Sequence, residues 1–126
     1  NVSNNTTQNN YIQDNCINIL NFRYDAAGSD NSSNLNDEYY TIKNECTYLI
    51  DMTGWTSSDN ASSPHVYTFP SFGLNTNSEV SVRTGSGTDD STNLYWGSNN
   101  HIWNNGGDTL SLKNSAGTLV ITYSYP

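Results

Sequence analysis

Short stretches of alternating apolar and polar residues, broken by turn-forming residues, run along most of the chain. In EVSVRT (79–84), Val80 and Val82 point to one side of an extended chain. In TLVITYSY (118–125), the same two-residue period places Ile121 on an apolar face. No segment shows sustained helical periodicity. The pattern therefore predicts β-strands that are each apolar on one face and polar on the other.

A strand with one apolar face needs a second layer to cover that face. About seven to nine such short strands in one domain predict an all-β, immunoglobulin-like β-sandwich with mostly antiparallel pairing. Residues 1–14 are polar and carry no pattern, so we expect a flexible N-terminal lead-in, followed by the folded domain over 15–126. The clearest predicted strands span 16–24, 38–44, 47–52, 66–69, 79–84, 109–113 and 118–125.

The first predicted strand, CINILNFRY (16–24), contains an irregularity. Its apolar positions change phase, from Ile17 and Ile19 to Leu20 and Phe22. An extra residue in one strand of an antiparallel pair causes such a change, so we expect a β-bulge at this point.

The chain has two cysteines, Cys16 and Cys46. If strands 16–24 and 38–44 pair antiparallel around the loop 25–37, Cys16 comes close to residue 46, within the range that a disulfide requires. We therefore predict a Cys16–Cys46 disulfide, with two free, half-buried thiols as the alternative. A zinc site is not expected, because the sequence has no CxxC and no cluster of Cys with His.

Only 13% of the residues are charged, and the net charge is −8. An acidic surface repels a phosphate backbone, which argues against nucleic-acid binding. No apolar run approaches the length of a membrane span. The chain starts without methionine or a signal-like segment, so we expect a mature chain or a domain cut from a longer protein. The polar composition and the paired cysteines favour an extracellular or cell-surface location.

Several short motifs occur in a fixed order along the chain, and together they are specific. They are Gly54-Trp55, Phe69-Pro70, Thr84-Gly85, Leu94-Tyr95-Trp96, Trp103-Asn104-Asn105 and Gly107-Asp108. With these motifs the chain resembles the lamin-tail domain family from about Cys16 to Tyr125, and it is closer to the prokaryotic branch than to nuclear lamins. The resemblance implies an immunoglobulin-like sandwich that serves as a non-catalytic module of a secreted or surface protein.

The three tryptophans can be read in two ways. They can form an aromatic platform for sugar rings, or they can belong to the core. In the family pattern, Trp55, Trp96 and Trp103 occupy strand positions beside inward-facing apolar residues, which favours the core. The Asn and Gly residues around them are turn formers. The expected structural core comprises Trp55, Phe69, Val80, Val82, Trp96, Trp103, Leu110, Leu112 and Ile121.

The sequence offers little catalytic chemistry. It has no nucleophile elbow, no phosphate-binding loop and no metal quartet, so we expect that the protein is not an enzyme and has no cofactor. Asp89 and Asp90 in GSGTDDSTN (85–93) are oxygen ligands that calcium accepts, but the segment lacks EF-hand spacing. We expect a solvated loop there, with calcium as the alternative. His65 and His101 show no ligand spacing.

These observations predict an interaction, adhesion or spacer module within a larger secreted or cell-surface protein. Protein partners or neighbouring domains would bind to the sandwich surface or by strand addition, with the first or last strand as the preferred edge. The alternative is a carbohydrate-binding module that uses exposed Tyr or Trp together with Asn and Asp.

Overall fold

The computed structural model describes residues 16–24, 34–104 and 106–125, and these form ten strands and one 3-10 helix, η1 (Leu35–Asp37). The predicted lead-in over 1–14 lies outside the described residues. The strands are β1 (Ile17–Arg23), β2 (Tyr39–Asn44), β3 (Ile50–Asp51), β4 (Thr56–Ser58), β5 (Val66–Thr68), β6 (Gly73–Leu74), β7 (Glu79–Arg83), β8 (Asn93–Tyr95), β9 (Asp108–Lys113) and β10 (Leu119–Tyr125).

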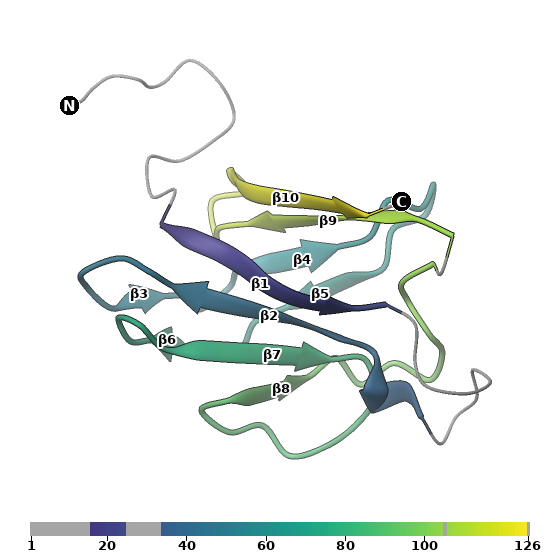
Figure 1. Cartoon of the computed structure of the whole chain (residues 1–126), viewed down its shortest axis with the longest axis horizontal. Coiled ribbons are helices and arrows are strands. Elements are labelled where there is room, and N and C mark those ends of the chain that lie inside the picture. The colour runs from purple at the N-terminus through teal and green to yellow at the C-terminus, as the bar shows by residue number, and fades with distance from the viewer. Residues whose placement is uncertain (1–15, 25–33, 105, 126) are drawn as a thin grey trace.

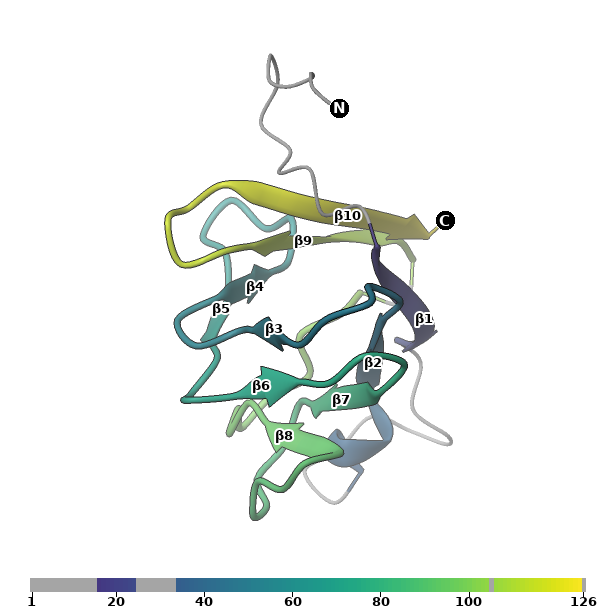
Figure 2. The same ribbon diagram turned by 90° about the vertical axis from the view of Figure 1, so that its left-hand side faces the viewer.

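Two four-stranded sheets make up the sandwich, with strand orders β1-β2-β7-β8 and β10-β9-β4-β5 (Figure 1). A small sheet of β3 and β6 lies on one flank, between the two larger sheets (Figure 2). The described strand pairs are antiparallel except β7 with β8, which is parallel. The predicted immunoglobulin-like β-sandwich is confirmed.

The pairing of β1 with β2 contains the predicted bulge. Ile19 pairs with Ile42, and the register then shifts before Asn21 pairs with Thr41. The residue that the shift leaves over is Leu20, whose side chain is 46% exposed. The change of apolar phase in the sequence therefore marked a real irregularity of this edge strand.

Strand β4 has no apolar residue, so alternation could not reveal it. Its central residue, Ser57, is nevertheless fully buried. The hydroxyl of Tyr40 donates a 2.7 Å hydrogen bond to Ser57 Oγ, which satisfies a polar group inside the core. A central strand can therefore face the core with a serine, because a tyrosine from the opposite sheet fills the space and supplies the hydrogen bond.

Most of the expected core residues are buried between the sheets, with two exceptions. Trp96 and Ile121 are only partly buried, although both pack against the core. Ile121 lies on the edge strand β10, and Trp96 follows the last residue of β8, so in each case neighbouring strands cover one side only. The buried members of the expected set are Trp55, Phe69, Val80, Val82, Trp103, Leu110 and Leu112.

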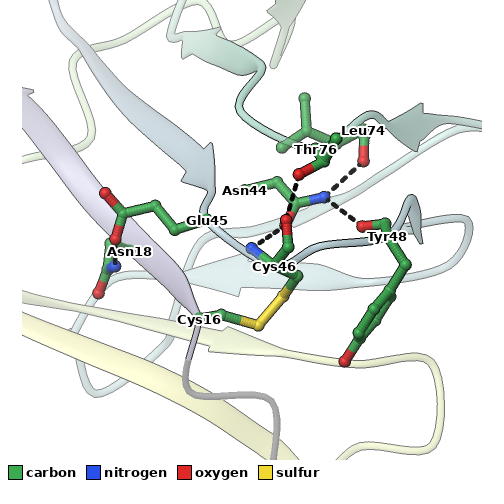
Figure 3. The surroundings of a disulfide bond; sticks show 8 residues. All are labelled: Cys16, Asn18, Asn44, Glu45, Cys46, Tyr48, Leu74 and Thr76. Atoms are coloured by element: carbon green, nitrogen blue, oxygen red, sulfur yellow. Dashed lines mark hydrogen bonds between the residues drawn. A yellow bond between two sulfur atoms is a disulfide. The ribbon is translucent and has the colours of Figure 1, made fainter.

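Cys16 and Cys46 are joined by a disulfide, with their Cα atoms 5.0 Å apart (Figure 3). The bond ties the start of β1 to the loop after β2. Asn44 fixes the same loop, because its amide nitrogen donates to the carbonyls of Tyr48 and Leu74 while its Oδ1 accepts from the Cys46 N–H. The segment that leads to β3 is therefore held at both ends.

Candidate functional site

Glu38 is a fully buried carboxylate just before β2. Its Oε1 accepts hydrogen bonds from the Thr84 hydroxyl at 2.6 Å and the Ile102 N–H at 2.8 Å, and its Oε2 pairs with His101 Nδ1 at 3.2 Å. His101 Nε2 lies 3.2 Å from Asn34 Oδ1. Both oxygens of Glu38 thus bind groups that belong to loops. This arrangement indicates that the cluster holds the loops in place.

Two further buried carboxylates hold the loops between β4 and β5 and before β9. Asp59 accepts from the backbone N–H of His65 at 2.8 Å and pairs with its ring Nδ1 at 2.7 Å. Asp108 accepts from the backbone N–H groups of Asn60 and Asn104. Like Glu38, these carboxylates are occupied by local hydrogen bonds, which accounts for their burial.

In the acidic loop before β8, the aspartate side chains accept hydrogen bonds from nearby backbone N–H groups. Asp90 Oδ1 accepts from the Thr92 N–H at 2.9 Å and the Asn93 N–H at 2.8 Å, and these bonds, with that of the Thr92 hydroxyl, lower the pKa of Asp90 below its ordinary value. Asp89 Oδ1 accepts from the Tyr95 N–H at 3.0 Å. The described residues include no group of three or more His, Cys, Asp or Glu side chains placed to hold a metal ion.

This loop also closes one edge of the sandwich. Strand β8 is the last strand of its sheet. The Asn93 carbonyl accepts from the Asp90 N–H at 2.9 Å, and the N–H groups of Asn93 and Tyr95 donate to the carboxylates of Asp90 and Asp89. Main-chain groups that an added strand would need are therefore used by the loop itself.

The other edges are covered in different ways. β1 and β10 meet along a row of aromatic rings, in which Phe22 stacks on Tyr123 at 5.5 Å and Tyr24 stacks on Tyr125 at 3.9 Å between ring centroids. Tyr123 is still 37% exposed. The short β5 lies between Pro64 and Pro70, and proline offers no N–H to an incoming strand.

Two adjoining hollows lie between the segment around β6 and the acidic loop. One, of about 390 Å³, is lined by Gly73–Asn75, Asn77–Glu79, Ser91 and Thr92. The other, of about 450 Å³, is lined by Pro70–Gly73, Asp89–Ser91 and Leu94. Gly73 and Ser91 line both. We call these two adjoining hollows the depression.

An exposed apolar side chain lies next to this depression. Tyr48 and Leu49 precede β3 and are 49% and 53% exposed. The Leu49 side chain covers Gly73, where an added Cβ would lie 3.3 Å from Leu49 Cδ2. The Tyr48 ring points away from Leu74 and lies on the side of the disulfide (Figure 3). We call the surface formed by Leu49, Pro70–Gly73 and Asp89–Leu94 the flank surface; it lies on the side of the sandwich that carries β3 and β6 (Figure 2).

The charged side chains that line the two hollows are all acidic. The exposed acidic residues of the described part are Asp37, Glu45, Asp51, Glu79, Asp89 and Asp90, and the last three line the hollows. No lysine or arginine lines either hollow. Sequence reasoning singled out Asp89 and Asp90 but not Leu49 or Gly73. The predicted strand 47–52 included Leu49, whereas β3 covers only Ile50–Asp51, and one sequence does not distinguish an exposed apolar residue from a buried one there.

The fold and the hydrogen-bonded carboxylates define an immunoglobulin-like domain that is consistent with a non-catalytic module. Residues 13–126 match the lamin tail domain. The chain therefore belongs to the lamin tail domain family. A comparison with curated proteins found no match. None of the described residues forms a helix long and apolar enough to cross a membrane.

Proposed function

We propose that this chain is a non-catalytic interaction module of a larger extracellular or cell-surface protein and that it binds a protein partner through the flank surface. The observation that carries the proposal is the exposure of Leu49 beside the depression around Gly73. The free energy falls when a partner covers a large apolar side chain that is exposed on a polar surface. The disulfide and the Asn44 hydrogen bonds hold this segment in place, which limits the ordering cost of binding.

An extracellular location is supported by the disulfide, because such bonds persist in oxidising compartments. The proposal requires no cofactor. It also assigns no catalysis, since the buried carboxylates Glu38, Asp59 and Asp108 are each held by hydrogen bonds to loops.

Site-specific photo-crosslinking tests the proposal. A benzophenone amino acid replaces Leu49 in the full-length parent protein in its native host, and Ala116, in the exposed turn between β9 and β10, is the control position. We expect a discrete protein adduct from position 49 and none from position 116. Equal labelling at both positions, or none at either, would contradict the flank surface as the binding site.

Polysaccharide binding is the second candidate. Burial of Trp55 and Trp103 removes two of the three tryptophan rings from a sugar platform, but the Tyr123 ring on β10 is 37% exposed and can contact a sugar ring. Affinity electrophoresis in polysaccharide gels tests this candidate. Retardation that Tyr123→Ala abolishes would support it, and unchanged mobility in every gel would exclude the polysaccharides used.

A further inference from the structure

The larger hollow of the flank surface combines an apolar floor with an acidic rim. We propose that this hollow binds an extended peptide segment of the partner that presents an arginine or lysine next to an aliphatic side chain; the inference rests on the function proposed above. The occupant is argued from charge complementarity between the hollow and a cationic side chain.

The floor suits the methylene stem of such a residue. Pro70, Phe72, Gly73 and Leu94 line the hollow. Long cationic side chains lay their aliphatic carbons along apolar surface while the charged end reaches polar groups. A volume of about 450 Å³ is enough for one such side chain and part of its neighbour.

The rim supplies two carboxylates whose positions are already set. Asp89 and Asp90 each use Oδ1 to accept backbone hydrogen bonds within their own loop. Such bonds fix the side chains before a ligand arrives, so less conformational entropy is lost on binding. Arginine and lysine make their strongest hydrogen bonds with carboxylates.

The cations of β2 and β7 do not line the hollow. Arg83 donates from Nε to Asn93 Oδ1 at 2.8 Å and from Nη1 to the Asn36 carbonyl at 2.8 Å, and its guanidinium lies 4.6 Å from the centre of the Tyr39 ring. Lys43 is the cross-strand neighbour of Glu79 on β7. Neither residue lines the hollow, so the charge of Asp89 and Asp90 remains available to a partner.

The test is a titration of the ¹⁵N-labelled 126-residue chain, followed by amide chemical shifts, with the capped peptide Gly-Arg-Leu-Arg-Gly. A peptide with citrulline in place of arginine has the same shape without the charge. The variant D89N/D90N keeps an oxygen that accepts the loop hydrogen bonds. The variant D37N/E45Q loses the same charge at two exposed positions outside the hollow and serves as the matched control.

We expect saturable shifts of the Gly73, Ser91 and Leu94 amides with the arginine peptide and none with the citrulline peptide. Affinity should fall about tenfold or more in D89N/D90N, because charged hydrogen-bond partners are lost, and stay close to wild type in D37N/E45Q. Shifts that both variants weaken equally would show general attraction to an acidic surface and overturn the proposal. Absence of shifts at these amides, or shifts caused by calcium chloride but not by the peptide, would also overturn it.

The two proposals can fail separately. If crosslinking from position 49 succeeds and the peptide titration fails, the flank surface remains the binding site and only the cationic partner is wrong. If crosslinking also fails, the proposed function itself is contradicted.

Discussion

The hydroxyl of Thr84 donates a 2.6 Å hydrogen bond to the carboxylate of Glu38, and both side chains are almost completely buried. The Ile102 N–H donates to the same oxygen. Glu38 immediately precedes β2, Thr84 immediately follows β7, and Ile102 lies in the segment between β8 and β9. One carboxylate therefore joins three parts of the chain that are distant in sequence.

Replacement of Glu38 by alanine should lower the free energy of unfolding by about 3–5 kcal/mol, because it leaves buried donors without an acceptor. Urea denaturation measures the change. Asp37→Ala, at the exposed neighbouring position, should change stability by no more than about 0.5 kcal/mol. A loss in Glu38→Ala as small as that of the control would show that the hydrogen bonds to Glu38 contribute little.

The Cys16–Cys46 disulfide closes a loop with a sequence separation of 30 residues. In the chain-entropy model, the double substitution Cys16→Ser and Cys46→Ser should reduce the free energy of unfolding by about 3–4 kcal/mol. Urea denaturation of the wild type with and without reductant provides an independent comparison. A thiol assay without reductant should find no free thiol in the folded chain, and two reactive thiols would refute the bond.

The rings of Trp103 and Trp96 are in edge-to-face contact, with their centroids 6.0 Å apart, but only Trp103 is buried. Trp103→Ala should destabilise by about 3–5 kcal/mol, and Trp96→Ala by less. Acrylamide quenching of single-tryptophan variants should be weak for Trp103 and for Trp55 and stronger for Trp96. Equal quenching of Trp96 and Trp103 would contradict the difference in burial.

The acid stability of the chain should depend on Asp90. Backbone hydrogen bonds from Thr92 and Asn93 lower its folded-state pKa below the ordinary 3.8. Such a group stabilises the folded state above the unfolded-state pKa, and the stabilisation is lost as the pH falls through the folded-state pKa.

The urea concentration at the midpoint of unfolding should therefore decrease as the pH is lowered from about 5 to about 2. The decrease should be smaller in Asp90→Asn, because its amide does not titrate. Asp37→Asn is the control, and it should retain the wild-type pH dependence. If Asp90→Asn loses as much stability on acidification as the wild type, the loop carboxylate does not contribute.

Much of the fold could be predicted from local patterns. Alternation places Val80 and Val82 on one face of a strand, and the change of phase after Ile19 marks a bulge, because side-chain direction in a strand depends only on the position along that strand. Register between two neighbouring strands was enough to bring Cys16 to Cys46. The number of short strands with one apolar face predicted the sandwich, and the order of the family motifs implied the same fold.

Other features depend on contacts that no local pattern contains. Whether Trp96 is covered depends on how far the neighbouring strands extend, and whether Ser57 can face the core depends on the hydroxyl of Tyr40 in the opposite sheet. The flank surface exists because Leu49 packs over Gly73, while Asp89 and Asp90 fold back on the edge of β8. The sequence by itself determined the longer strands and the disulfide pair, because these follow from local alternation and from the register of two neighbouring strands. Only the tertiary structure decided which apolar and acidic groups reach the surface together, because that depends on contacts between distant segments.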